Sequence, residues 1–199
     1  KNRDLIKVLS GVRRSGKSTL LAMFQQDLKE QGVQDENIIA INFEYMEFEE
    51  LTDYRKLHDY VLSKVDKNKK NYVFLDEIQH VQNFEKVVDS LYIRDYIDLY
   101  ITGSNAFFLS GELATLLTGR YIEQHVLPLS FQEFKQWHTE NNPTIQQLSN
   151  RDLYAMYTRS SFPYTLAMTN QQETYDYLQA VYASVMFRGG SGNLNNTYK

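Results

Sequence analysis

The segment Gly11–Ser18 has the spacing Gly-x-x-x-x-Gly-Lys-Ser and carries the first recognisable chemistry of the chain. Its glycines allow successive backbone N–H groups and a following helix N-terminus to point at one centre, which suits the phosphates of a nucleotide. Lys17 would neutralise phosphate charge as a binding and catalytic residue, and the Ser18 hydroxyl would ligate Mg²⁺. We expect the cofactor-binding residues of this loop to be Gly11, Val12, Arg13, Arg14, Ser15, Gly16, Lys17, Ser18 and Thr19.

An acidic pair closes the apolar run in the segment YVFLDEIQ, Tyr72–Gln79. Open α/β sheets place their sites at the carboxyl ends of the strands, which is where Asp76 and Glu77 would lie. Asp76 suits the outer sphere of Mg²⁺, and Glu77 suits a general base that orients and deprotonates a water molecule. A solvated acidic pair at a turn is the alternative, and the upstream glycine-rich motif disfavours it.

Two further segments contain candidate site residues: Asn105 and Arg120 as catalytic residues, and Ser104 as a residue that binds the nucleotide. Ser104 and Asn105 follow an apolar run, where either side chain would sense a γ-phosphate; an N-cap of a helix starting at Ala106 is an equally good and compatible explanation. Arg120 precedes the last run and is a candidate for contacting a phosphate in a neighbouring subunit, with an ordinary surface arginine as the alternative.

These residues require elements that bring them together, and short apolar runs alternate with helical periodicity, as in repeated βα units around a parallel sheet. The expected strands are Leu5–Leu9, Ile38–Ile41, Tyr72–Leu75, Leu99–Thr102 and, at a sheet edge, Tyr121–Leu127. The expected helices begin near Gly16 and at Tyr54–Val65, Asn83–Tyr92 and Ala106–Leu117.

A second, helical subdomain is expected after Pro128. Ser130 and Glu133 have the spacing of a capping box, and helical patterns follow at Leu153–Arg159 and Glu173–Phe187, with a turn at Phe162-Pro163 between them. We therefore predict a core over residues 1–128, a helical lid over 129–188, and a linker, tag or junction over 189–199, where Gly, Ser and Asn dominate.

Composition narrows the class of protein. The chain has 199 residues, 42% hydrophobic residues, a net charge of -4 and no Cys, which excludes a disulfide framework and a thiol nucleophile and favours a reducing, cytoplasmic compartment. No apolar run is long enough to span a bilayer, so we expect no membrane association. The mild acidity argues against binding nucleic acid by phosphate neutralisation alone. The four histidines have no metal-ligand spacing, so we assign them structural or solvent roles.

Taken together, four blocks resemble a family of prokaryotic AAA+ superfamily ATPases. They read GVRRSGKSTLL, VFLDEIQ, ITGSNAFFLSGELATLLTGR and LPLSFQEF, and the resemblance covers about residues 4–135 in the family's order. In that family the phosphate loop commonly carries the same paired arginines. After Pro163 the chain departs from the pattern, because RSSFPYTL stands where the family usually has two glycines before Phe-Pro.

The resemblance implies a P-loop NTPase fold, with a five-stranded parallel sheet of order 5-1-4-3-2, flanking helices and a helical lid. It also implies a C-terminal domain that this chain largely lacks, so we interpret the chain as a fragment. The implied activity is Mg²⁺-dependent ATP hydrolysis that switches an attached effector or a bound macromolecule. Homo-oligomers and a nucleic acid or protein partner are the implied associations. Arg151 and Arg159 are available as a second sensor, and neither is preferred.

Three alternatives remain to be compared with ATP hydrolysis. A P-loop kinase needs an acceptor pocket rather than a Glu beside the magnesium Asp. A GTP switch is disfavoured because Asn68-Lys69-Lys70 is followed by Asn71 rather than completing NKxD. A nucleotide-binding interaction module with negligible turnover is poorly separated from an ATPase by sequence.

Overall fold

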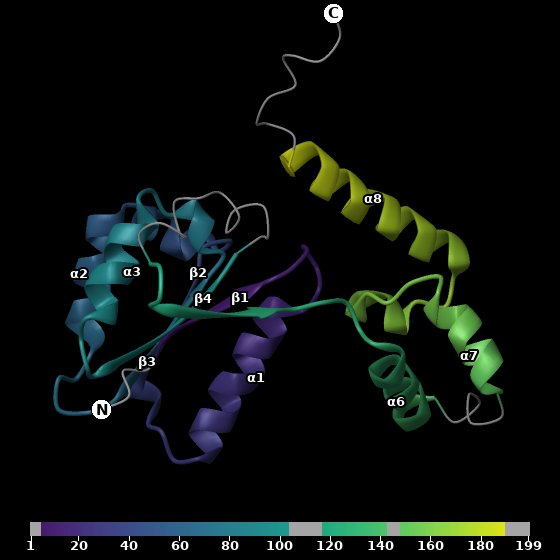
Figure 1. Ribbon diagram of the computed structural model, residues 1–199, viewed down its shortest axis with the longest axis horizontal. Coiled ribbons are helices and arrows are strands. Elements are labelled where there is room, and N and C mark those ends of the chain that lie inside the picture. The colour runs from purple at the N-terminus through teal and green to yellow at the C-terminus, as the bar shows by residue number, and fades with distance from the viewer. Residues whose placement is uncertain (1–4, 104–116, 143–147, 190–199) are drawn as a thin grey trace, which may run out of the picture. The chain divides into compact units, whose positions relative to one another are not determined.

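The computed structural model describes residues 5–103, 117–142 and 148–189. It divides into two compact units (Figure 1). The first comprises the chain up to Gly11 together with Lys17–Val126, and the second comprises Val12–Gly16 together with the chain from Leu127 onward. None of the helices in the described part of the chain combines the length and apolar character needed to cross a membrane.

The first unit is built on a five-stranded sheet in the order β2-β3-β4-β1-β5, and every pair of neighbours is parallel. This confirms the expected order. The strands are β1 (Ile6–Ser10), β2 (Ile38–Asn42), β3 (Asn71–Asp76), β4 (Ile97–Thr102) and β5 (Tyr121–His125).

Strand burial follows the apolar pattern of the sequence. β4 is buried along its whole length and β3 nearly so, as expected for central strands with both faces covered. β5 pairs only with β1, and most of its side chains are exposed, which confirms its place at an edge. It ends at His125 rather than at Leu127. After it, the Val126 N–H still donates to the Ser10 carbonyl at 2.7 Å, and Pro128 has no N–H to continue the ladder.

Helices cover both faces of the sheet (Figure 1). On one face α1 (Lys17–Glu30) buries Leu21 and Leu28 with Phe74 and Tyr100 of the sheet. The larger core lies on the other face, under α2 (Tyr54–Lys64) and α3 (Phe84–Tyr92). Short 3₁₀ turns occupy Asp35–Asn37, Met46–Thr52 and Ile78–His80. The helix expected at Ala106–Leu117 lies outside the described residues apart from Leu117.

The second unit is helical, with α6 (Phe131–Asn141), α7 (Asn150–Tyr157), a 3₁₀ turn (Pro163–Ala167) and α8 (Gln171–Gly189). The predicted capping box at the start of α6 is confirmed: the Ser130 N–H donates to Glu133 Oε2 at 2.7 Å. This bond and one from the Ser130 hydroxyl hold the pKa of the Glu133 carboxyl below its ordinary value. A second capping box at Ser149 and Asp152 starts α7 before the expected Leu153.

A buried asparagine fixes the amino end of β3. Asn71 is fully buried, and its Oδ1 accepts hydrogen bonds from Asn37 Nδ2 at 3.2 Å and from the Asp66 N–H at 3.0 Å. Its Nδ2 donates to the carbonyl oxygens of Asp66, Lys69 and Tyr96 at 2.7, 3.0 and 3.1 Å. One side chain therefore ties β3 to the segments that lead into β2 and β4.

We predict that Asn71→Leu lowers the free energy of unfolding by at least about 2 kcal/mol, because it leaves buried carbonyl groups without donors at nearly unchanged side-chain volume. Chemical denaturation measures the change. The control is Asn68→Leu in the same loop, where the side chain is exposed and the change should stay within about 0.5 kcal/mol. Equal losses in the two variants would contradict the role of the Asn71 bonds.

Candidate functional site

The loop between β1 and α1 adopts a backbone that glycine favours. Gly16 has a φ of 103°, and Arg14 adopts a φ of 68° although it carries a side chain. Within the loop the Ser15 N–H donates to the Val12 carbonyl at 3.3 Å. Residues with a positive φ curl a loop around a centre. In a non-glycine residue this backbone conformation is strained, and strained residues of this kind are common at functional sites.

Two buried polar groups in this loop suit an anion. The Ser15 hydroxyl is buried and has no hydrogen-bond partner in the described part of the chain. Lys17, the first residue of α1, is only 4% exposed, and its Nζ donates to the Gly11 carbonyl at 3.2 Å. Ser18 and Thr19 follow it and are exposed. Hydroxyl and ammonium donors at a helix N-terminus fit a phosphate group.

Asp76 lies at the carboxyl edge of the sheet and is 6% exposed. Its Oδ2 accepts a hydrogen bond from Asn42 Nδ2 at 3.0 Å, and its Oδ1 accepts one from the Thr102 hydroxyl. Asn42 ends β2 and Thr102 ends β4, so the carboxylate joins the ends of three neighbouring strands. The orientation of this carboxylate is therefore fixed from both sides.

The donor set at this edge fits Mg²⁺ in the way expected of nucleotide sites. Each carboxylate oxygen of Asp76 keeps lone-pair capacity beyond its one hydrogen bond. Among the described residues no group of three or more His, Cys, Asp and Glu side chains could hold a metal by itself. Mg²⁺ typically binds through one or two protein oxygens, several waters and substrate phosphates, so Asp76 and the Ser18 hydroxyl are a sufficient protein contribution.

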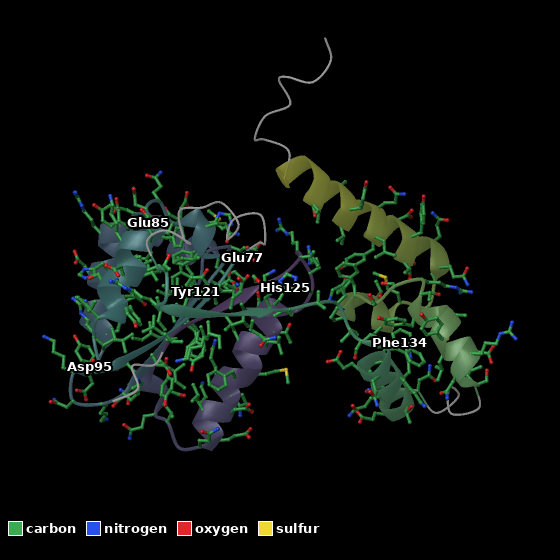
Figure 2. All side chains as sticks on the ribbon, in the orientation of Figure 1. Glu77, Glu85, Asp95, Tyr121, His125 and Phe134 are labelled. Carbon is green, nitrogen blue, oxygen red and sulfur yellow. The ribbon has the colours of Figure 1, made fainter. Side chains whose placement is uncertain are left out.

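Glu77 adopts a left-handed backbone, with φ 57° and ψ 47°. Its N–H donates to the Thr102 hydroxyl oxygen at 2.9 Å, and its Oε2 accepts a hydrogen bond from Gln79 Nε2. The Thr102 hydroxyl thus accepts from Glu77 and donates to Asp76. Figure 2 shows Glu77 at the same end of the sheet as His125, opposite Asp95.

Sequence reasoning missed three residues of this site, namely Asn42, Thr102 and Gln79. Asn42 is a polar residue directly after an apolar run, which is the same signal that identified Asp76. The apolar run predicts Thr102 as the end of a strand, but no sequence pattern indicates a role for its hydroxyl in the site. The contact of Gln79 with Glu77 depends on the 3₁₀ turn that follows β3, and no sequence pattern indicated it.

Arg120 directly precedes β5, and its guanidinium pairs with the Asp89 carboxylate of α3. It also lies 5.9 Å from the centre of the Tyr92 ring. Both members of the ion pair are nearly half exposed, and such pairs are worth about 0–1 kcal/mol. The arginine is therefore available to a stronger anion.

The structure places β4 between β1 and β3, which the proposed role of Ser104 and Asn105 requires. At the end of β4 the Gly103 N–H donates to the Leu9 carbonyl at 3.4 Å. Ser104 and Asn105 themselves lie outside the described residues, so their roles stay predictions.

A parallel sheet of this order, with GxxxxGKS between its first strand and helix, defines the P-loop NTPase fold. The family described as "AAA domain" matches residues 3–135. The chain belongs to this family, which confirms the AAA+ resemblance.

Two relatives share substantial identity with the chain. An uncharacterized protein of Haemophilus influenzae is 40% identical over 188 residues, which are 94% of this chain and 46% of the relative. An uncharacterized protein of Methanocaldococcus jannaschii is 37% identical over 153 residues, covering 70% of this chain and 32% of the relative. The chain thus spans less than half the length of these curated relatives.

Solved structures share the fold at low identity. Cdc6p from Pyrobaculum aerophilum has a TM-score of 0.53 at 12% identity, with 94% of this chain and 58% of that chain covered. AMPPCP-bound DnaA from Aquifex aeolicus has a TM-score of 0.51 at 12% identity, with 94% of this chain and 56% of that chain covered. PCH-2 of C. elegans has a TM-score of 0.51 at 15% identity, with 94% of this chain and 62% of that chain covered.

We predict that Asp76→Asn weakens Mg²⁺-ATP binding at least about 10-fold and weakens binding of ATP in excess EDTA much less, because a metal ligand acts through the ion. Calorimetric titration with and without Mg²⁺ measures both affinities. Asp95→Asn, at the opposite end of the sheet, is the matched control and should bind like the wild type (Figure 2). Equal losses with and without Mg²⁺ would exclude a metal-linked role for Asp76.

Proposed function

We propose that this chain binds ATP with Mg²⁺ and hydrolyses the γ-phosphate anhydride. Bound Mg²⁺ would neutralise phosphate charge and orient the γ-phosphate. Ser18 and Asp76 would hold the ion, and Lys17 with the loop Gly11–Thr19 would bind the phosphates. Glu77 orients a water molecule and accepts its proton as the water attacks the γ-phosphate; ADP leaves.

One observation carries this proposal: the Thr102 hydroxyl links the Asp76 carboxylate to the Glu77 backbone. A general base must stand at a fixed distance from the metal ligand if water and phosphate are to meet in line. The link fixes the backbone at Glu77 relative to Asp76, and the left-handed conformation at Glu77 sets the direction in which its side chain leaves. Ser104 and Asn105 are proposed to contact the γ-phosphate from the adjacent strand.

We further propose that hydrolysis drives an attached effector or a bound macromolecule, a nucleic acid or a protein. The chain covers 46% of its Haemophilus influenzae relative, so a large part of such proteins lies outside the aligned segment and could be that effector. The absence of Cys supports a reducing, cytoplasmic compartment.

A second candidate is a nucleotide-binding interaction module with negligible turnover. The Gln79 amide donates a hydrogen bond to one oxygen of the Glu77 carboxylate. This contact makes that oxygen less able to accept a proton from water, which favours slow turnover. A P-loop kinase is a weaker candidate, since it would need an acceptor pocket in place of Glu77.

Single-turnover hydrolysis of ATP by the full-length protein, with and without DNA, tests the proposal. Release of phosphate without an added acceptor is expected and excludes a kinase. Binding of ATP without any hydrolysis, in the presence or absence of DNA, would favour the interaction module instead.

We predict that Glu77→Gln retains Mg²⁺-ATP binding and slows hydrolysis about 100-fold or more, because the amide is nearly isosteric but cannot accept the proton. Single-turnover rates and calorimetric affinities of the same preparation separate the two effects. Glu85→Gln on α3 is the control and should hydrolyse ATP normally. A wild-type rate for Glu77→Gln would leave Glu77 as a turn residue.

We also propose that subunits assemble head to tail and that Arg120 stabilises charge on the neighbour's γ-phosphate. Arg120→Ala should then bind ATP normally and hydrolyse it about 1,000-fold more slowly, as when an arginine finger is lost. Mixing Arg120→Ala with Glu77→Gln should restore part of the activity, because some interfaces then pair an intact Glu77 with an intact Arg120. Asp89→Ala, which removes the ion-pair partner of Arg120 but leaves the arginine itself, should remain active. Hydrolysis independent of protein concentration and unaffected by Arg120→Ala would contradict this role.

A further inference from the structure

The helical unit contains a pocket of about 720 Å³ that the proposed ATPase chemistry does not use. Its volume falls within the range of about 300–1,000 Å³ typical of small-molecule sites. The pocket is formed by α6, α7, the connection between α7 and α8, and α8. The described lining includes Phe134, His138, Arg159, Leu166 and Leu178.

The inner wall of the pocket consists of apolar side chains and one histidine ring. Phe134, labelled in Figure 2, is buried in α6, and Leu166 and Leu178 are half-buried. His138 is 6% exposed, and its Nδ1 has no hydrogen-bond partner among the described residues. Burial lowers the pKa of the His138 imidazole, so the ring is neutral at pH 7. This wall would contact an apolar group of a ligand, and His138 Nδ1 would form a hydrogen bond with a polar group beside it.

One cationic side chain lies on the rim, and the described lining contributes no carboxylate. Arg159 is exposed, makes no ion pair with any described residue, and is the one arginine or lysine among the described lining residues. The remaining polar members of the described lining are the His138 imidazole and side chains that bear hydroxyl or amide groups. A pocket with an apolar wall on one side and one guanidinium among uncharged polar groups on the other suits a ligand with an apolar body and a single anionic end.

We propose that this pocket binds an amphipathic small-molecule anion, with its apolar body between α6 and α8 and its carboxylate paired with Arg159. This binding would be additional to nucleotide binding. It also assigns a role to Arg159, which the sequence analysis named with Arg151 as a candidate second sensor. All of the described lining residues belong to the helical unit.

The test compares a carboxylate with its neutral analogue. Decanoate and decanol are titrated into the full-length protein and followed by displacement of the fluorescent anion 8-anilinonaphthalene-1-sulfonate. We expect saturable decanoate binding with a Kd on the order of 1 mM or tighter. Arg159→Gln should weaken decanoate at least about 10-fold and leave decanol unchanged, because only the ion pair is lost.

Two further variants separate the site from nonspecific adsorption. Arg151→Gln, on the exposed part of α7 and outside the lining, is the matched control and should bind both compounds normally. Leu178→Trp fills the pocket and should weaken both compounds at least about 10-fold, with thermal unfolding used to confirm that the variant is folded.

Four results would overturn the proposal. They are absence of saturable decanoate binding, equal loss in Arg159→Gln and Arg151→Gln, unchanged binding in Leu178→Trp, and loss of ATP rather than decanoate affinity in Arg159→Gln. The last result would assign Arg159 to the nucleotide.

Discussion

The buried carboxylate of Asp76 is the constraint on which the arrangement of the candidate site depends. Both of its oxygens accept hydrogen bonds, from Asn42 at the end of β2 and from Thr102 at the end of β4. A buried carboxylate without partners would be costly, so these three strand ends must finish at the same level of the sheet. At the opposite edge, Asn71 ties the start of β3 to the segments before β2 and β4.

At this fixed edge, the adjacent residues Asp76 and Glu77 are held in two different ways, which suits the two different roles proposed for them. Asp76 is held by side chains from its neighbours, whereas the Glu77 side chain contacts Gln79, two residues along the chain. The carboxylate proposed to bind the metal is therefore rigid, and the proposed base is held by one local amide. Such a contact can be exchanged for a water molecule without disturbing the sheet. The left-handed backbone at Glu77 is consistent with strain retained for function.

Much of the fold could be predicted because buried parallel strands appear as short apolar runs, such as those ending at Asp76 and Thr102. Asp76 and Glu77 were identified for the same reason. The roles of Asn42 and Gln79 could not be predicted, since the first depends on the register between β2 and β3 and the second on a 3₁₀ turn. The lining of the helical pocket, including His138, depends on packing between helices that no local pattern specifies.

The measurement that tests the central claim most directly is the affinity of Mg²⁺-ATP for the wild type and for Lys17→Ala. Lys29→Ala, at the other end of α1, serves as the control. If the loop before α1 binds phosphates, losing the buried Lys17 ammonium should weaken ATP at least about 10-fold, and Lys29→Ala should have no effect. Wild-type affinity in a folded Lys17→Ala protein would contradict the assignment of the loop and the site built on it.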